Sequence, residues 1–76
     1  STSGKSPNII NALQEAKKRS VVCIGLSGNH RGPMQDLCEH YLAVPSADTP
    51  KIQEGHAVLG HILCGLVENA IFKAQP

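Results

Sequence analysis

VVCIGL, residues Val21 to Leu26, contains neither a charged residue nor an alternation of polar and apolar positions. A strand with one solvent-facing side alternates, whereas a strand covered on both faces, as in a parallel sheet, is apolar throughout. The run therefore predicts a parallel strand covered on both faces. Residues 27–33, which follow it, read SGNHRGP and have the composition of a loop.

The segments on either side of this run alternate between helical and extended patterns. Upstream, Ile9, Leu13 and Ala16 recur at the spacing of one helix face. Ser6 is a preferred helix cap, and Pro7 suits the first helical position, where its missing N–H costs nothing. We expect helical segments over residues 7–19, 34–39 and about 51–73, and strands over residues 21–26 and 41–44.

This order of elements predicts an α/β fold with right-handed crossovers. Two parallel strands do not make a stable domain, because both faces of each strand need cover. The loop at residues 1–7 is of the kind that follows a strand, and the 76 residues hold no strand ahead of it. We therefore expect residues 1–76 to be the C-terminal half of a single larger α/β domain. So short a chain buries only about 60% of its unfolded surface, which predicts a complementary chain.

Composition argues against several classes of partner. The formal net charge is +1, and the basic run at residues 17–19 is too short to neutralise many phosphates of a nucleic acid. One Tyr, one Phe and no Trp leave few rings for base stacking. The apolar stretch at residues 58–67 is interrupted by His61 and falls short of the roughly 18 residues of a membrane span. We expect a soluble, cytoplasmic protein without nucleic-acid or membrane partners.

The three cysteines, Cys23, Cys38 and Cys64, are odd in number and widely spaced. Cys23 and Cys64 lie inside apolar runs. This pattern is typical of small buried hydrophobic residues in a reducing cytosol rather than of a disulfide framework or a zinc knuckle.

The first seven residues, STSGKSP, have the composition of an anion-binding loop. Backbone N–H groups that converge at the start of a helix bind phosphate, and hydroxyls ahead of the glycine suit the many oxygens of a phosphate monoester. A helix cap formed by Ser6, with no ligand, is the structural alternative.

A P-loop is a further alternative, because Gly4-Lys5-Ser6 matches the end of G-x-x-x-x-G-K-[ST]. That motif would require a glycine one residue before Ser1. A P-loop nucleotidase also needs an acidic metal partner at the end of a neighbouring strand, and neither predicted strand ends in one. Pro7, directly after the serine, further favours a cap at Ser6.

The last predicted helix carries two histidines in different settings. His56 shares its apolar face with Ile52 and Leu59, which predicts a core histidine with a satisfied hydrogen bond. His61 lies on another side, about 80° around the helix from Gln53 at 100° per residue. An imidazole in so apolar a stretch is costly to bury without a partner, so a proton-transfer or metal-ligand role is a hypothesis for His61. Gly60 and Gly65 in the same helix suggest that another helix backbone packs closely there.

Together, the stretches STSGKSPNII, VVCIGLSGNHRGPM, YLAVPSADTPKIQEGH and VLGHILCGLVE resemble the C-terminal half of the phosphoheptose isomerase family, in the sugar isomerase (SIS) superfamily. The match extends over nearly all 76 residues in the same order. The resemblance implies half of a three-layer α/β/α sandwich with a parallel, flavodoxin-like sheet. It also implies a homotetramer with active sites at subunit interfaces.

The resemblance assigns roles to particular residues. Gln53 and His61 correspond to active-site residues that bind zinc in some members, and His61 corresponds to the acid–base histidine. The reaction implied is the isomerisation of a ketose phosphate, sedoheptulose 7-phosphate, to the aldose glycero-manno-heptose 7-phosphate. A proton-shuttling glutamate and a further zinc-ligand histidine belong to the N-terminal half of the family's domain. Binding of the sugar phosphate is assigned to Ser1, Thr2, Ser3 and Ser6.

Two positions depart from the family pattern. Lys5 stands where the family usually has Asn, and Pro50 stands where relatives commonly have another residue. Two alternatives also remain open, a non-catalytic SIS module that binds sugar phosphates or a protein, and a P-loop nucleotide-binding fragment.

Overall fold

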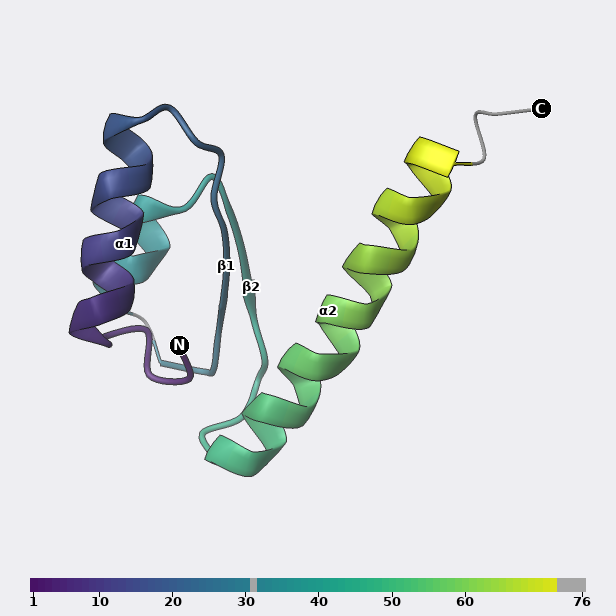
Figure 1. Ribbon diagram of the computed structural model, residues 1–76. Helices are drawn as coiled ribbons and strands as arrows, with labels where there is room; N and C mark the ends of the chain where they lie inside the picture. Colours follow the sequence, from purple (N-terminus) through teal and green to yellow (C-terminus); the bar gives the residue numbers. More distant parts are fainter. Residues whose placement is uncertain (31, 73–76) are drawn as a thin grey trace.

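The computed structural model describes residues 1–30 and 32–72. The order of helices and strands predicted from the sequence is confirmed, and the two strands are parallel. Helix α1 and the 3-10 helix η1 lie on one side of the strands, and helix α2 extends away on the other side (Figure 1). The elements are α1 (Pro7–Lys18), β1 (Ile24–Ser27), η1 (Pro33–Leu37), β2 (His40–Ala43) and α2 (Thr49–Phe72).

The strand pairing brings the carboxyl ends of both strands to one edge. Ile24 lies opposite His40, and Ser27 lies opposite Ala43. The crossover between the strands contains η1, whose Met34 is only 2% exposed. The N-terminal loop and the start of α2 lie at the same end of the strands (Figure 1). Ligands of open α/β sheets bind at this edge, where the connecting loops meet.

Strand β1 is shorter than predicted, because residues 21–23 lie outside it. The Cys23 carbonyl accepts hydrogen bonds from the N–H groups of Glu39 (3.1 Å) and His40 (3.2 Å). The Cys23 N–H donates to the Glu39 carboxylate at 2.6 Å, so a side chain takes the place of a strand partner here. That hydrogen bond favours the charged carboxylate and lowers the pKa of Glu39.

The prediction that β1 is covered on both faces is wrong for this chain alone. Ile24 is 51% exposed and Val22 is 67% exposed. The reason is the course of α2, which meets the strands near its start and then runs away from them (Figure 1). Within the described part of the chain, the apolar side chains buried to 2% exposure or less are Met34 and Ile52.

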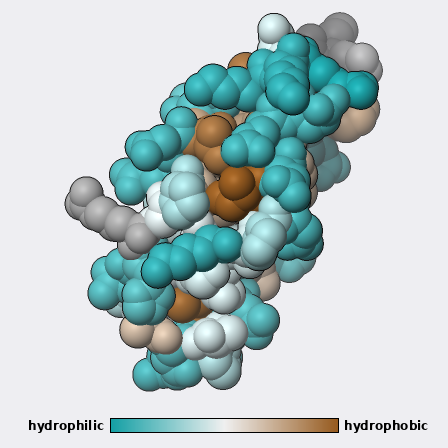
Figure 2. All heavy atoms as spheres, turned by 90° about the vertical axis from the view of Figure 1, so that its left-hand side faces the viewer, coloured by the Kyte–Doolittle hydropathy of each residue, from teal (hydrophilic) through white to brown (hydrophobic). Residues whose placement is uncertain are grey.

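Helix α2 leaves most of its apolar side chains uncovered, whereas the side of the molecule that holds α1 is mostly hydrophilic (Figure 2). The predicted close approach of another helix at Gly60 and Gly65 is not found among the described residues, since no atom outside the adjacent backbone of α2 lies within 4 Å of the Cβ position at either glycine. The apolar side chains of α2 that are more than half exposed are Val58, Ile62, Leu66, Val67, Ile71 and Phe72.

The same helix is long and apolar enough to cross a membrane, by length and composition alone. It has 24 residues, with a mean hydropathy of 1.3 over its 18-residue window. The expectation that no segment reaches this criterion is therefore wrong, because Ala70, Ile71 and Phe72 continue the apolar character past residue 67 and charged residues in the helix are few. A single such helix is weak evidence for a membrane span, because core helices of soluble proteins meet the same criterion.

Candidate functional site

The N-terminal loop is held against the carboxyl end of β1 by backbone hydrogen bonds. The Ser1 nitrogen donates to the Leu26 carbonyl at 3.0 Å, and the Gly28 N–H donates to the Thr2 carbonyl at 3.1 Å. Gly4 is buried and has a φ of 71°, a left-handed conformation that glycine adopts at little cost. The loop is thus anchored at the sheet edge where ligands of α/β proteins bind.

Three of the four predicted phosphate ligands form one hydroxyl cluster. The Ser1 Oγ lies 2.8 Å from the Ser6 Oγ and 3.3 Å from the Ser3 Oγ. Two backbone N–H groups point at the cluster, that of Gly4 to the Ser1 Oγ and that of Lys5 to the Ser3 Oγ, both at 3.1 Å. Hydroxyls and N–H groups gathered in this way can all donate to an anion. We define Ser1, Ser3 and Ser6 as the hydroxyl cluster.

Ser6 occupies the predicted cap position of α1 but does not form the predicted side-chain cap. Its backbone is extended, with φ −61° and ψ 120°, and its carbonyl accepts from the Ile10 N–H at 3.0 Å. The side chain makes no hydrogen bond to the helix and is instead paired with Ser1. The cap prediction is wrong in this respect, because the nearby Ser1 hydroxyl competes for the same oxygen. The start of α1 is therefore left without a side-chain acceptor, as at helix ends that bind anions.

Thr2 differs from the other predicted phosphate ligands. Its carbonyl accepts the hydrogen bond from Gly28 and so ties the loop to β1. A Cβ added to Gly28 would lie 2.9 Å from the Thr2 carbonyl oxygen and even closer to the Ile52 side chain. Gly28 is a site residue that was not predicted from the sequence, although a Ser-Gly pair directly after an apolar strand is a recognisable signal for close backbone approach.

Helix α2 presents Gln53 and His61 to solvent, since both side chains are exposed. His56, by contrast, is half-buried, and its Nε2 lies 2.9 Å from the Ser27 carbonyl oxygen. The prediction that His56 has a satisfied hydrogen bond is confirmed. The hypothesis of a proton-transfer or metal-ligand role for His61 rests on the cost of burying its imidazole. In this chain the His61 side chain is exposed, so that argument applies only if another chain or segment covers α2.

The positions of the His, Cys, Asp and Glu side chains show whether this chain alone could hold a metal ion. Among residues 1–30 and 32–72, no group of three or more His, Cys, Asp or Glu side chains is placed to hold a metal ion. Zinc in proteins takes four ligands in structural sites, and three protein ligands with an open position in catalytic sites. Gln53 and His61 would therefore supply only part of a zinc site.

The three cysteines are free thiols. Cys23 and Cys38 are half-buried, and burial is the main reason that the pKa of Cys38 is raised, with the nearby Cys23 and Glu39 adding to it. Cys64 is exposed. The expectation that the cysteines are buried is wrong for Cys64 in this chain, because the second half of α2 runs away from the strands (Figure 1).

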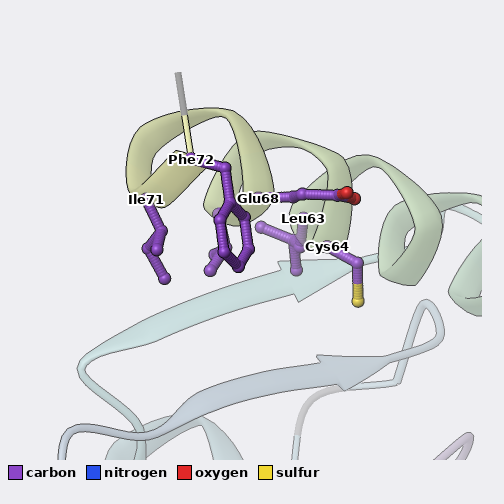
Figure 3. A pocket seen from close by; sticks show the side chains of 6 residues that line it. Leu63, Cys64, Glu68, Ile71 and Phe72 are labelled. Carbon is purple, nitrogen blue, oxygen red and sulfur yellow. The ribbon is translucent and has the colours of Figure 1, made fainter. Parts of the chain in front are cut away.

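A shallow apolar hollow lies along the second half of α2, far along the helix from His56. Figure 3 shows side chains projecting from one side of the helix, with Glu68 the only charged residue among them. Its lining offers neither an anion-binding group nor an acid–base pair, so it is not the candidate site. The lining residues are Leu63, Cys64, Val67, Glu68, Ile71 and Phe72.

The amino-acid sequence of this chain is similar to part of several known proteins. A phosphoheptose isomerase of Burkholderia pseudomallei (strain K96243) is 64% identical over 75 residues, which cover 99% of this chain. The predicted resemblance to phosphoheptose isomerases is confirmed. The phosphoheptose isomerase of Aneurinibacillus thermoaerophilus is 52% identical over 96% of this chain, and that of Maridesulfovibrio salexigens is 49% identical over 97%. No protein-family model matches the chain.

The similarity to phosphoheptose isomerases concerns part of those proteins. The chain spans 38% of the Burkholderia protein, 37% of the Aneurinibacillus protein and 36% of the Maridesulfovibrio protein. A parallel pair of strands flanked by helices is compatible with an α/β unit, and two strands alone do not make a complete sheet of that kind.

Proposed function

We propose that residues 1–76 are the C-terminal half of a single SIS domain in a cytoplasmic phosphoheptose isomerase. The full-length protein converts sedoheptulose 7-phosphate to glycero-manno-heptose 7-phosphate. The observation that carries this proposal is the hydroxyl cluster, which is placed at the start of α1 and at the carboxyl end of β1. The 64% identity to a protein named phosphoheptose isomerase supports it.

In this proposal the N-terminal loop binds the phosphate of the sugar. The hydroxyls of Ser1, Thr2, Ser3 and Ser6 donate to phosphate oxygens, and the Ser1–Ser6 pair is exchanged for bonds to the ligand. The dipole of α1 adds typically 0.3–1 kcal/mol for an anion at its N-terminus. Lys5 is exposed next to the cluster and adds a positive charge that salt screens.

The isomerisation itself moves protons between neighbouring atoms of the sugar. A base removes the proton from the hydroxyl-bearing carbon beside the carbonyl while the carbonyl oxygen accepts a proton, which gives an enediol. The base then returns its proton to the former carbonyl carbon while the neighbouring hydroxyl loses its proton, which forms the aldehyde. By resemblance that base is a glutamate of the N-terminal half. His61 then serves as the acid–base group, and an imidazole suits proton transfer near neutral pH.

Gln53 and His61 are also the proposed zinc ligands of this half. Zinc bound there would act as a Lewis acid on the substrate oxygens. The imidazole nitrogen of His61 is a ligand type that zinc accepts, whereas the assignment of Gln53 rests on the resemblance. The further ligands would come from outside the described residues. His61 and Gln53 lie eight residues apart on α2, so the helix sets their relative positions.

The exposed apolar side chains of α2 support assembly into a homotetramer through this helix. Val58, Leu66 and Val67 are each more than half exposed, which is costly in a helix without a partner. A non-catalytic SIS module that binds a sugar phosphate is the second candidate. It is favoured by the N-terminal loop, which could bind a phosphate without the proton-shuttling glutamate that catalysis needs. A P-loop is less well supported, because β1 and β2 end in Ser27 and Ala43 rather than in an acidic residue.

The test of the phosphate loop uses two serines of the hydroxyl cluster. In the full-length protein, Ser1→Ala combined with Ser3→Ala should weaken the binding of sedoheptulose 7-phosphate at least tenfold, because two donors to the phosphate are lost. The melting temperature should stay nearly unchanged, because these side chains are only half-buried. Gln14→Ala, on the exposed side of α1, is the matched control. Equal affinity in calorimetric titrations of the double variant and the wild type would remove the phosphate-loop assignment.

A further inference from the structure

One side-chain hydrogen bond joins α2 to the end of β1. The His56 Nε2 lies 2.9 Å from the carbonyl oxygen of Ser27, across 29 residues of sequence. A carbonyl oxygen can only accept, so the imidazole carries its hydrogen on Nε2 and donates. Ser27 is completely buried, and its own hydroxyl donates to the Gly28 carbonyl at 3.1 Å. The bond from His56 therefore ends on a rigid part of the sheet rather than on a loose loop.

The same dipeptide is also attached to the N-terminal loop. Gly28, the residue after Ser27, donates its N–H to the Thr2 carbonyl at 3.1 Å. Ile52 lies one helical turn before His56, is 1% exposed and fills the space in which Gly28 lacks a side chain. Ile52 and His56 thus hold Ser27 and Gly28 from the side of α2, while Thr2 holds Gly28 from the side of the loop.

His56 lies between the two residues of α2 for which a chemical role is proposed. It follows Gln53 by three residues and precedes His61 by five. At 1.5 Å per residue, His61 stands roughly 7.5 Å farther along the helix axis than His56. A bond that fixes the rotation of α2 about its axis at His56 therefore fixes the direction of the His61 side chain as well. Apolar packing of Ile52 alone would fix this rotation less sharply, because dispersion contacts have little directional preference.

We propose that His56 is a positioning residue, which sets the place of His61 relative to the phosphate loop through the carbonyl of Ser27. This inference rests on the proposed function, in which the loop holds the phosphate and His61 acts at the reacting carbons. Hydrogen bonds through Gly28 and Ser27 connect the loop with His56, and α2 itself connects His56 with His61. A displacement of about 1 Å between such groups can reduce turnover by roughly a hundredfold.

The test compares two replacements of His56 in the full-length protein. His56→Leu keeps an apolar side chain of similar reach but has no donor. His56→Gln retains an N–H donor that can reach the Ser27 carbonyl. Gln14→Ala, at an exposed position of α1, is the matched control. The readouts are kcat and KM for sedoheptulose 7-phosphate, the melting temperature, and hydrogen–deuterium exchange of the Gly28 amide.

With a positioning role, His56→Leu lowers kcat about 10- to 100-fold and changes KM less than about threefold, because phosphate binding is retained. His56→Gln restores kcat to within about threefold of the wild type. Unchanged kcat in His56→Leu overturns the inference, and so does a loss of kcat that the glutamine does not rescue in a folded variant. If His56→Leu fails to fold, the glutamine variant decides alone, since a folded glutamine variant with a kcat loss of more than tenfold contradicts the donor role.

Failure of the proposed function gives a different result. A wild-type protein that does not turn over sedoheptulose 7-phosphate contradicts the proposed function, whatever the variants do. The exchange measurement then decides the inference, because loss of the His56 bond should speed exchange of the Gly28 amide at least tenfold, and the glutamine variant should slow it again. Exchange at Gly28 that is equal in the wild type and His56→Leu overturns the link between α2 and the loop.

Discussion

Replacement of Gly28 by alanine tests the contact between the phosphate loop, the end of β1 and α2. Gly28 is buried, and an added methyl group would overlap the Ile52 side chain and lie 2.9 Å from the Thr2 carbonyl oxygen. Ile52 is itself 1% exposed and has little room to move, and the Thr2 oxygen belongs to the backbone. Overpacking of this kind costs about 1–3 kcal/mol of the free energy of unfolding.

The assay for Gly28→Ala is urea unfolding of the full-length protein, together with titration by sedoheptulose 7-phosphate. We expect the unfolding midpoint to fall and the affinity for the sugar phosphate to weaken, because relief of the overlap must move either Ile52 or the loop at Thr2. Gly60→Ala is the control, since Gly60 lies in α2 and no atom outside the adjacent helix backbone lies within 4 Å of its Cβ position. Alanine there should stabilise the helix by roughly 1 kcal/mol. Gly28→Ala with unchanged midpoint and affinity would refute the reasoning, and a destabilised Gly60→Ala would show another helix packed at that glycine.

Three further predictions concern pH, assembly and activity. The pKa of Glu39 is lowered in the folded chain, so its bond from Cys23 stabilises the fold above the ordinary carboxyl value of about 4.3 and is lost as the pH falls through the lower folded value. The free energy of unfolding should therefore fall less steeply with acid in Glu39→Gln than in the wild type, and equal slopes would contradict the bond. Leu66→Glu should shift the full-length protein towards smaller species in sedimentation, because Leu66 is 60% exposed on the apolar helix α2, whereas Gln14→Glu on α1 should not. An unchanged distribution of sedimenting species would exclude the Leu66 side of α2 as the subunit contact. Residues 1–76 alone should show no isomerase activity, because the proposed base lies outside them and general-base catalysis typically contributes 10²–10⁴-fold; turnover by the purified 76-residue chain would disprove this.

Local sequence patterns predicted the elements because their causes are local. Helical spacing and Pro7 define α1, and the apolar run at residues 21–26 identifies the first strand. The start of that strand was predicted too early, because the Cys23 N–H donates to the Glu39 carboxylate rather than to a strand partner. The strand ends at Ser27, one residue later than predicted. Such a bond depends on the fold and leaves no periodic signal in the sequence.

The site was predictable as a set of residue types but not as a set of contacts. The serines were recognisable by composition, yet the pairing of Ser6 with Ser1 rather than with its own helix depends on how Gly4 turns the loop. The partner of His56 lies 29 residues away, so no local pattern could name Ser27. Exposure of Ile24 and Cys64 has a different cause, because their apolar surroundings indicate cover that residues 1–30 and 32–72 do not supply.

Turnover of sedoheptulose 7-phosphate by the full-length protein and by its His61→Ala variant tests the central claim most directly. The wild type should form the aldose heptose 7-phosphate. His61→Ala should lose this activity at least a hundredfold, since general acid–base groups contribute 10²–10⁴-fold. Its affinity for the sugar phosphate should change less than about threefold, because the phosphate is held by the loop. A wild-type protein without heptose phosphate isomerisation, or a His61→Ala variant as active as the wild type, would contradict the account.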